Sequence, residues 1–480
     1  MTSPLPENFT LKFDPALRTY ADGTVLLGGS PYRLMRISTQ AVPIIQAWQR
    51  GEPVGRHGDL ARRFTQAGIA EPVPPAPPRT PAAPARISVV VPVLNNASGL
   101  DRLLQHLVSI PVIVVDDVSG PMQHNAIAEL CESRDVTLIT HVTNRGPAAA
   151  RNTGWHASST STDFVCFIDS DAIVDSENIR RLAAHFADPD VVAAAPRIVA
   201  FSTNTASTAT QRYENRHSPL DIGDRAAHVA ALTRVAYVPS TCLIVTKAAL
   251  AQTQGFDESM RFGEDVDLVW RLGQIGSVRY DPEATVQHEH PATLAALVKR
   301  RIGYGSSAAA LTKRHPKNVA PANCSAYTAA AWAAIATGHP IVAAATMAAT
   351  AAQLPKKLTD VPKNDAIKLA MTGHLKAWQM FTSATRRAWL PLILVAAIRS
   401  KHARRWLLLS LITVKPLKAI DDVAYCVGVY KGCWQEKSLA AIVPKFSQWP
   451  PRRDAGPATS GDQSAPPRQI AVDSTTKNEP

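Results

Sequence analysis

Two groups of carboxylates follow short apolar runs in the first half of the chain. Asp116-Asp117 comes directly after Val112–Val115, and Asp169-Ser170-Asp171 comes directly after Phe164–Ile168. Carboxylates this close repel each other, so a cation or a set of hydrogen-bond donors has to compensate them. Hard oxygen ligands in this pattern suit Mg²⁺ or Mn²⁺, ions that usually also bind substrate phosphates. A DxD triplet alone is weak evidence for such a site, because many loops contain one by chance.

Other polar residues in the same part of the chain strengthen the case for a phosphate-binding site. Asn144 to Asn152 is a glycine-containing turn followed by small residues that open a helix, which lets the backbone approach a ligand. Arg151, within it, could reach a diphosphate or form an internal salt bridge instead. Farther on, Glu264-Asp265 begins an apolar helix, where acids are also favoured simply by the helix dipole.

The elements that must position these groups are four nearly continuous β-branched runs, typical of strands buried on both faces. Helix-like segments such as residues 99–108 and 122–133 separate them. This alternation predicts an α/β domain with a parallel sheet and ligands at the carboxyl ends of the strands. The predicted strands are Ile87–Val93, Val112–Val115, Val136–Ile139 and Phe164–Ile168.

In order and spacing, residues 86–310 resemble the family-2 glycosyltransferases, whose GT-A fold is a Rossmann-like nucleotide-diphospho-sugar transferase domain. The resemblance implies transfer of a sugar from a nucleotide donor, with inversion at the anomeric carbon. It is specific for the fold and the reaction type but not for the sugar. The matching pieces are Pro92-Val93-Leu94-Asn95, Asp116-Asp117, Asn144 to Asn152, Asp169-Ser170-Asp171 and Glu264-Asp265.

The resemblance also implies roles for individual residues. Asp117 would contact the uracil, Asp169 the ribose or the metal, and Asp171 the metal. Asp265 would be the general base that takes the proton from the acceptor hydroxyl. The metal and Arg151 would stabilise the leaving diphosphate.

Five further residues are assigned in the same way. Pro92, Asn95 and Asn144 belong to the expected nucleotide-sugar site. His288 aligns with a histidine that ligates the metal in some members, and a histidine satisfied in the core or at the surface is the alternative. Arg301 lies where related enzymes close over the donor diphosphate, although basic residues there could also coat a helix near lipid headgroups.

The chain before residue 86 predicts a separate module. Residues 74–85 are rich in proline and form a semi-rigid spacer, which isolates residues 1–73. Val25–Leu27 and Tyr32–Ile37 predict a strand pair, followed by two helices, the first capped by Ser38 or Thr39. The arrangement is similar to small winged-helix domains that present a strand edge to a leader peptide. Peptide recognition by strand addition and a plain structural appendage are both compatible with it.

The C-terminal third of the chain differs from the rest in charge. Residues 1–290 carry a net charge of −5, whereas residues 291–480 carry +17. An anionic membrane surface or nucleic acid would suit the basic part. Nucleic acid is not expected, because the basic residues are not interleaved with aromatic ones as in a base-stacking surface.

The apolar segments of residues 311–449 predict a helical, basic region that meets a membrane. Residues 325–354 lack charged side chains and could span a bilayer or form a buried helical hairpin. Residues 388–395 and 406–414 are too short to span, but tryptophan beside Arg and Lys fits a helix in the membrane interface. The tail at 450–480 has the composition of a disordered segment.

Taken as a whole, the chain resembles the mycofactocin-system glycosyltransferases. That resemblance implies transfer of glucose from UDP-glucose to a peptide-derived redox cofactor, building a β-linked oligoglucan. The expected location is the cytoplasmic side of the cell membrane, since residues 1–8 do not form a cleavable signal. A transferase acting on a polyprenyl-phosphate or cell-envelope glycan is the rival enzyme. A catalytically idle GT-A binding module is the rival of another class.

Overall fold

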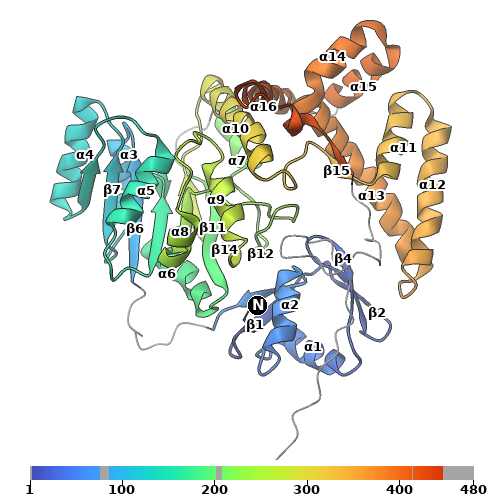
Figure 1. The fold of residues 1–480 in the computed structure, drawn as a ribbon, viewed down its shortest axis with the longest axis horizontal. Coiled ribbons are helices and arrows are strands. Elements are labelled where there is room, and N and C mark those ends of the chain that lie inside the picture. Colours follow the sequence, from blue (N-terminus) through green and yellow to red (C-terminus); the bar gives the residue numbers. More distant parts are fainter. Residues whose placement is uncertain (1–2, 76–85, 202–207, 413, 447–480) are drawn as a thin grey trace, which may run out of the picture. The chain divides into compact units, whose positions relative to one another are not determined.

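The computed structural model describes residues 3–75, 86–201, 208–412 and 414–446 (Figure 1). Residues 76–85 of the predicted spacer and the predicted disordered tail at 450–480 lie outside this range. The chain divides into two compact units. One comprises Met1–Phe13 and Gly51–Leu297, and the other comprises Asp14–Arg50 and Val298–Pro480.

The first unit is an α/β domain built on a nine-stranded sheet. The strand order is β10-β14-β11-β13-β9-β6-β7-β8, and β12 pairs with β14. Strands β9, β6, β7 and β8 are parallel, as the sequence predicts. The strands are β6 (Ile87–Val93), β7 (Val112–Asp116), β8 (Thr137–Thr140), β9 (Phe164–Ile168), β10 (Ala172–Ile173), β11 (Val191–Ala200), β12 (Ala227–His228), β13 (Cys242–Thr246) and β14 (Ser277–His288).

The rest of the sheet corrects the prediction that all strands are parallel. Strand β13 lies antiparallel between β9 and β11, and β10 and β12 are antiparallel to β14. The sheet is therefore mixed. The residues of β13 are buried like those of the parallel strands, so its composition carries no sign of its direction.

Helices cover both faces of the sheet (Figure 1). Alternate residues such as Val89 and Val91 belong to the core shared with α3, α4 and α6. On the other face Val115 packs with Ala150 of α5, and a Cβ on Gly154 of α5 would overlap the Val90 side chain, so this helix lies close to β6. The helices are α3 (Ala97–Leu104), α4 (Pro121–Ser133), α5 (Pro147–Ala157), α6 (Ser176–Ala184), α7 (Ala209–His217), α8 (Lys247–Thr253) and α9 (Glu264–Leu272).

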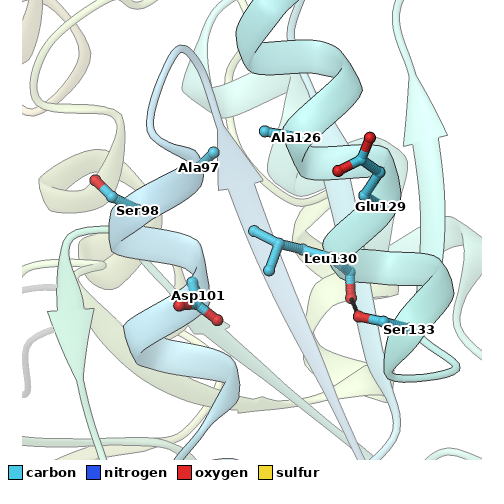
Figure 2. Close-up of a pocket in the computed structure, with 7 residues that line it drawn as sticks. All are labelled: Ala97, Ser98, Asp101, Ala126, Glu129, Leu130 and Ser133. Carbon is cyan, nitrogen blue, oxygen red and sulfur yellow. Dashed lines mark hydrogen bonds between the residues drawn. The ribbon is translucent and has the colours of Figure 1, made fainter.

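An open groove with a volume of about 490 Å³ runs between α3 and α4. Figure 2 shows Ser98 and Asp101 on one wall and Glu129 and Ser133 on the other. None of the residues predicted to bind the donor, the metal or the acceptor lines it.

Part of the N-terminal region belongs to the first unit. Strand β1 (Thr10–Phe13) pairs antiparallel with β5 (Ala70–Val73), and α2 (Gly58–Gln66) lies between them in the chain. Arg62 of α2 donates two hydrogen bonds, 2.7 and 2.5 Å long, to the carboxylate of Asp188. Both side chains are buried, so each needs the other to compensate its lost hydration.

Residues 14–50 belong to the second unit. They form an antiparallel sheet of β2 (Arg18–Tyr20), β3 (Val25–Gly28) and β4 (Arg33–Arg36), followed by α1 (Ala41–Gln49). The predicted strand pair is confirmed. The predicted cap, Ser38 or Thr39, is wrong. Helix α1 has Gln40 as its N-cap, and the side chain of Gln40 makes no capping hydrogen bond.

This small sheet packs on the helical part of the second unit. Val25 and Leu27 of β3 share a core with Leu358, Val361 and Ala366. Around that core, Tyr20 donates a hydrogen bond to Asp365 and Arg36 pairs with Asp360.

The remainder of the second unit is mainly helical, as predicted, and contains one short parallel pair of strands, β15 (Asn323–Cys324) and β16 (Lys445–Phe446). The helices are α10 (Leu294–Arg314), which begins in the first unit, α11 (Ala326–Ala336), α12 (Pro340–Lys357), α13 (Lys363–Ala384), the π-helical η2 (Thr385–Trp389), α14 (Leu390–Arg399), α15 (Lys401–Ile412) and α16 (Pro416–Gln435). Residues 325–354 thus form a helical hairpin, α11 followed by α12. Within the described parts of the chain, no helix has the length and apolar character needed to cross a membrane.

Two clusters hold this helical region together. Trp332, Trp378 and Trp406 pack with ring centroids 5.2 to 6.4 Å apart and join α11, α13 and α15. The second, called here the α16 charge cluster, is built around two buried aspartates. It comprises Arg301, Arg386, Arg387, Lys418, Asp421 and Asp422.

Candidate active site

The first carboxylate pair lies at the carboxyl end of β7 and is buried. Asp116 accepts a hydrogen bond from the backbone N–H of Ser119 at 2.9 Å and one from Nδ1 of His124 at 2.7 Å. These bonds shape the turn between β7 and α4. A structural role therefore accounts for Asp116.

Asp117 organises the loop that leads into α5. Its carboxylate accepts hydrogen bonds from the backbone N–H groups of Arg145 and Gly146, at 2.8 and 2.7 Å, and from Nδ1 of His141 at 2.7 Å. The side chain of Asn144 donates to the carbonyl oxygen of Asp117 at 3.0 Å. An ionised carboxylate can accept about four hydrogen bonds, so one further donor can still bind Asp117.

Asn95 connects the carboxyl ends of β6 and β7. It has a φ of 54°, and its side-chain oxygen accepts a hydrogen bond from the backbone N–H of Gly120 at 2.7 Å. Its own N–H donates to the hydroxyl of Ser119 at 2.8 Å. Pro92 lies in β6 opposite Val115 of β7. Both residues thus belong to the edge of the sheet where Asp117 lies.

Arg151 of α5 links the DxD triplet to helix α9. Its guanidinium donates to Asp169 at 2.7 Å and to Glu264 at 3.0 Å, and its side chain is buried. Burial lowers the pKa of Arg151, but the carboxylates of Asp169 and Glu264 outweigh this and raise it overall. The structure shows the internal salt bridge that the sequence left open, and contact of Arg151 with a diphosphate stays a prediction.

Asp265 lies in the first turn of α9, where the helix dipole favours acids. Its carboxylate accepts a hydrogen bond from the N–H of Val266 at 2.8 Å. Burial raises the pKa of Asp265, and the nearby carboxylate of Asp169 raises it further. Burial and the charge of Asp265 also raise the pKa of Glu264, to about 7. The two acids therefore hold protons more tightly than free carboxyl groups do.

Asp171 and His288 meet because two strands pair. Ala172 of β10 is opposite His288 of β14 in the antiparallel register, which places Asp171 next to the end of β14. The Nε2 atom of His288 lies 3.3 Å from a carboxylate oxygen of Asp171. The other ring nitrogen of His288 is buried and has no hydrogen-bond partner among the described residues.

The pair of Asp171 and His288 could supply two ligands to a divalent cation. Mg²⁺ is commonly held by one or two carboxylates together with substrate phosphates, and imidazole suits Mn²⁺ and similar ions. No group of three His, Cys, Asp or Glu side chains able to hold a metal occurs in the described ranges. One carboxylate beside one imidazole fits an ion that also binds a substrate diphosphate.

Arg301 belongs to the second unit, whereas the other predicted site residues belong to the first. Its Nε donates to Asp421 at 2.5 Å, and its guanidinium lies 5.7 Å from the ring centroid of Tyr304. Pairing within the α16 charge cluster accounts for its burial. Its role at the donor diphosphate stays a prediction.

Comparison with known proteins shows the family of the chain. The model of the family described as glycosyl transferase family 2 matches residues 88–248. The pre-mycofactocin glycosyltransferase of Mycobacterium tuberculosis, from strains CDC 1551 / Oshkosh and ATCC 25618 / H37Rv, is 36% identical over 474 residues, which cover 92% of this chain and 98% of that protein. The chain belongs to the mycofactocin-system glycosyltransferases.

This glycosyltransferase is also similar to more distant proteins. The succinoglycan biosynthesis protein ExoA of Rhizobium meliloti (strain 1021) is 26% identical over 236 residues, 47% of this chain and 70% of that protein. Among solved structures, the mannosyltransferase PcManGT from Pyrobaculum calidifontis, in complex with GDP-Man and Mn²⁺, is 16% identical. That match covers 73% of this chain and 87% of the other, with a TM-score of 0.39.

The glycosyltransferase has site residues that the sequence predictions missed. His141 donates to Asp117, and Arg261 donates to the side chain of Asn144 at 3.1 Å. Glu258 pairs with Arg145 at 2.7 Å and so joins the loop before α9 to the loop before α5. The nearby Gly255 to Glu258 stretch is visible in the sequence, but nothing local indicates which residues it contacts.

Proposed function

We propose that this glycosyltransferase moves glucose from UDP-glucose to a peptide-derived redox cofactor precursor and builds a β-linked oligoglucan on it. One arrangement of side chains supports the proposed sugar transfer. Arg151 joins Asp169 of the DxD triplet to the first turn of α9, which also contains Asp265, and β10–β14 pairing sets Asp171 against His288. The printed name of the Mycobacterium tuberculosis relative supports the choice of acceptor.

The nucleotide part of the donor would bind at the ends of β6 and β7. Asp117 keeps one acceptor position for the uracil, and Asn95 and Asn144 hold the two loops around it. Pro92 belongs to the same edge, and Asp169 would accept a hydrogen bond from the ribose. Sugar nucleotides in α/β sheets bind at this carboxyl edge.

Transfer would proceed in a single displacement. The acceptor hydroxyl oxygen forms a bond to the anomeric carbon while the bond from that carbon to the diphosphate oxygen breaks. Asp265 takes the proton from the hydroxyl, and the electron pair leaves with the diphosphate. Its raised pKa makes the Asp265 carboxylate a stronger base than an ordinary aspartate.

Asp171 and His288 would hold Mg²⁺ or Mn²⁺, which supplies positive charge to the leaving diphosphate when bound. Arg151 would add a second positive charge. In the described residues it bridges Asp169 and Glu264, so it also fixes the distance between the DxD triplet and α9.

The acceptor and the cell location are further parts of the proposal. Within residues 1–73, the small sheet of β2, β3 and β4 would recognise the peptide portion by pairing one of its edge strands with it. The basic C-terminal region would bring the enzyme to an anionic membrane surface on the cytoplasmic side. Its net charge of +17 over residues 291–480 supports this.

Incubation of the purified full chain with a panel of UDP-sugars, Mn²⁺ and candidate peptide acceptors tests the proposal. Mass spectrometry should show a ladder of hexose additions on the peptide with UDP-glucose, and no ladder when EDTA is present. Label that enters only lipid would contradict the peptide acceptor and favour the polyprenyl-phosphate rival. Equal activity in EDTA would contradict the metal.

A further inference from the structure

Helices α14 and α15 expose an apolar surface, called here the α14–α15 face. No residue of α14 is buried, although its sequence is almost entirely aliphatic. The two helices lie side by side and are joined at Ser400 (Figure 1). The face consists of Leu392, Leu394, Val395, Ile398, Leu408, Leu409, Leu411 and Ile412, whose exposed fractions range from 37% to 76%.

The spacing of these residues makes the surface continuous along each helix. Leu392, Val395 and Ile398 follow one another at intervals of three, as do Leu408 and Leu411, so each set lies along one side of its helix. Soluble monomers rarely expose a contiguous apolar patch of this kind, because isolated apolar residues are the rule on their surfaces. A concentrated patch indicates a binding surface.

The α14–α15 face belongs to an ordered part of the second unit. Trp406 of α15 is buried in the tryptophan cluster and donates a hydrogen bond to Thr385 at 2.9 Å. Arg386 donates to the carbonyl oxygen of Ser410 at 2.6 Å. One side of α15 is therefore held by the helical core while the other side stays exposed.

Basic residues surround the junction of the two helices. Arg399, Lys401, Arg404 and Arg405 are all exposed. The sequence has no Asp or Glu between Asp365 and Asp421, so no acid offsets them locally. Long basic side chains beside aliphatic ones are the arrangement that lets a helix lie in the headgroup region of a bilayer.

We propose that the α14–α15 face docks this glycosyltransferase on a bilayer of anionic phospholipid, with both helices lying in the interface of one leaflet. The proposal rests on the membrane attachment proposed above and names the surface that produces it. The helices have 10 and 12 residues, about 15 and 18 Å, which is too short to cross about 30 Å of hydrocarbon. A second copy fits the same face less well, because self-association would bring two sets of four uncompensated cations together.

Vesicle flotation with the full chain tests this surface. One variant replaces Val395, Ile398 and Ile412 by serine, and a second replaces Arg399, Lys401 and Arg405 by glutamine. The matched control carries Ile341→Ser and Val342→Ser, because these residues of α12 are 83% and 55% exposed in the same unit but lie outside the face. Vesicles contain either equal parts of phosphatidylglycerol and phosphatidylcholine or phosphatidylcholine alone.

The wild-type chain and the α12 control should float with the anionic vesicles, and each face variant should lose at least about tenfold in partitioning. Binding to neutral vesicles should be weaker for every chain. If the wild-type chain floats and both face variants float equally well, the α14–α15 face is wrong while membrane attachment stands. If the wild-type chain does not float at all, the proposed attachment itself is wrong. Sedimentation that shows a dimer dispersed only by the serine variant, with flotation unchanged, would assign the face to self-association.

Discussion

The predicted donor site of the first unit contains a charged group, called here the donor edge, that consists of Arg151, Asp169, Glu264 and Asp265. The donor edge and the α16 charge cluster of the second unit both bury arginine against carboxylate, but negative charge is in excess in the first and positive charge in the second. At the donor edge, the carboxylates of Asp169, Glu264 and Asp265 gather around the single Arg151. In the α16 charge cluster, four cations share Asp421 and Asp422. Excess negative charge at the first of these places favours a bound cation.

From this difference we expect chemistry at the donor edge, and we expect the α16 charge cluster to hold helices together. Glu264 and Asp265 have raised pKa values because their burial is incompletely compensated. Asp422, by contrast, is completely buried and accepts from Arg386 and Lys418 at 2.7 and 2.5 Å. Substitution at the donor edge should therefore change activity, and substitution in the α16 charge cluster should change stability.

Of the substitutions that test this difference, Asp265→Asn should have the largest effect on activity. Loss of the general base should lower kcat by about 10²- to 10⁴-fold while the thermal midpoint stays near that of wild type. Initial rates with UDP-glucose and thermal unfolding measure the two quantities. Glu129→Gln, an exposed acid on α4, is the control and should leave both unchanged. A fully active Asp265→Asn enzyme would remove Asp265 from the mechanism.

Asp171→Ala should lower kcat by at least about 100-fold and raise the Mn²⁺ concentration needed for half-maximal activity. His288→Ala should act in the same direction but less, by about tenfold to 100-fold. Titration of activity with Mn²⁺ distinguishes a weakened metal site from a misfolded chain, since only the former recovers at high metal. If both variants kept the metal dependence of the wild type, Asp171 and His288 would not be the metal ligands.

Asp422→Asn should destabilise the protein by about 3–5 kcal/mol, because Arg386 would remain buried without its counter-charge. The activity of the folded fraction should not change. Asp360→Asn is the matched control, since its partnership with Arg36 is half-exposed and contributes at most about 1 kcal/mol. Chemical denaturation compares the two. If Asp422→Asn lost activity without losing stability, the structural role proposed for the α16 charge cluster would be wrong.

The smallest expected effect concerns pH. Asp265 must be ionised to accept a proton, so kcat should fall as pH drops through its raised pKa, above the ordinary value of 3.8. Asp169→Asn removes a carboxylate whose negative charge raises the pKa of Asp265, so this acid limb should move to lower pH by about one unit or less. The pH profile of kcat measures the shift. A limb that moves to higher pH would show that Asp169 does not act on Asp265 through its charge.

Much of the first half of the sheet could be predicted because its signal is local. Strands β6 and β9 span the predicted residues, and β7 and β8 differ from prediction by one residue. Buried parallel strands appear as continuous β-branched runs, and the polar residues that follow them mark the carboxyl edge. The fold class and the carboxylates of the donor edge therefore follow from short segments.

The rest depends on contacts that no short segment contains. Asp117 is held by His141, and Arg301 by Asp421, a residue 120 positions away. The direction of β13 depends on where the chain returns to the sheet, which its five residues do not indicate. Residues 14–50 pack on residues 358–366, so the proline-rich stretch alone does not predict how the chain divides.

The register between β10 and β14 has a consequence for how the enzyme matures. Residue 171 and residue 288 are separated by most of the catalytic domain, and a slip of one residue would turn His288 to the other face of the sheet. An ion held by both side chains would therefore stabilise only the completed, correctly aligned chain. During synthesis, the nucleotide-binding loops at Asp117 can form long before the second ligand leaves the ribosome. The metal would act as a checkpoint that couples activity to the end of folding.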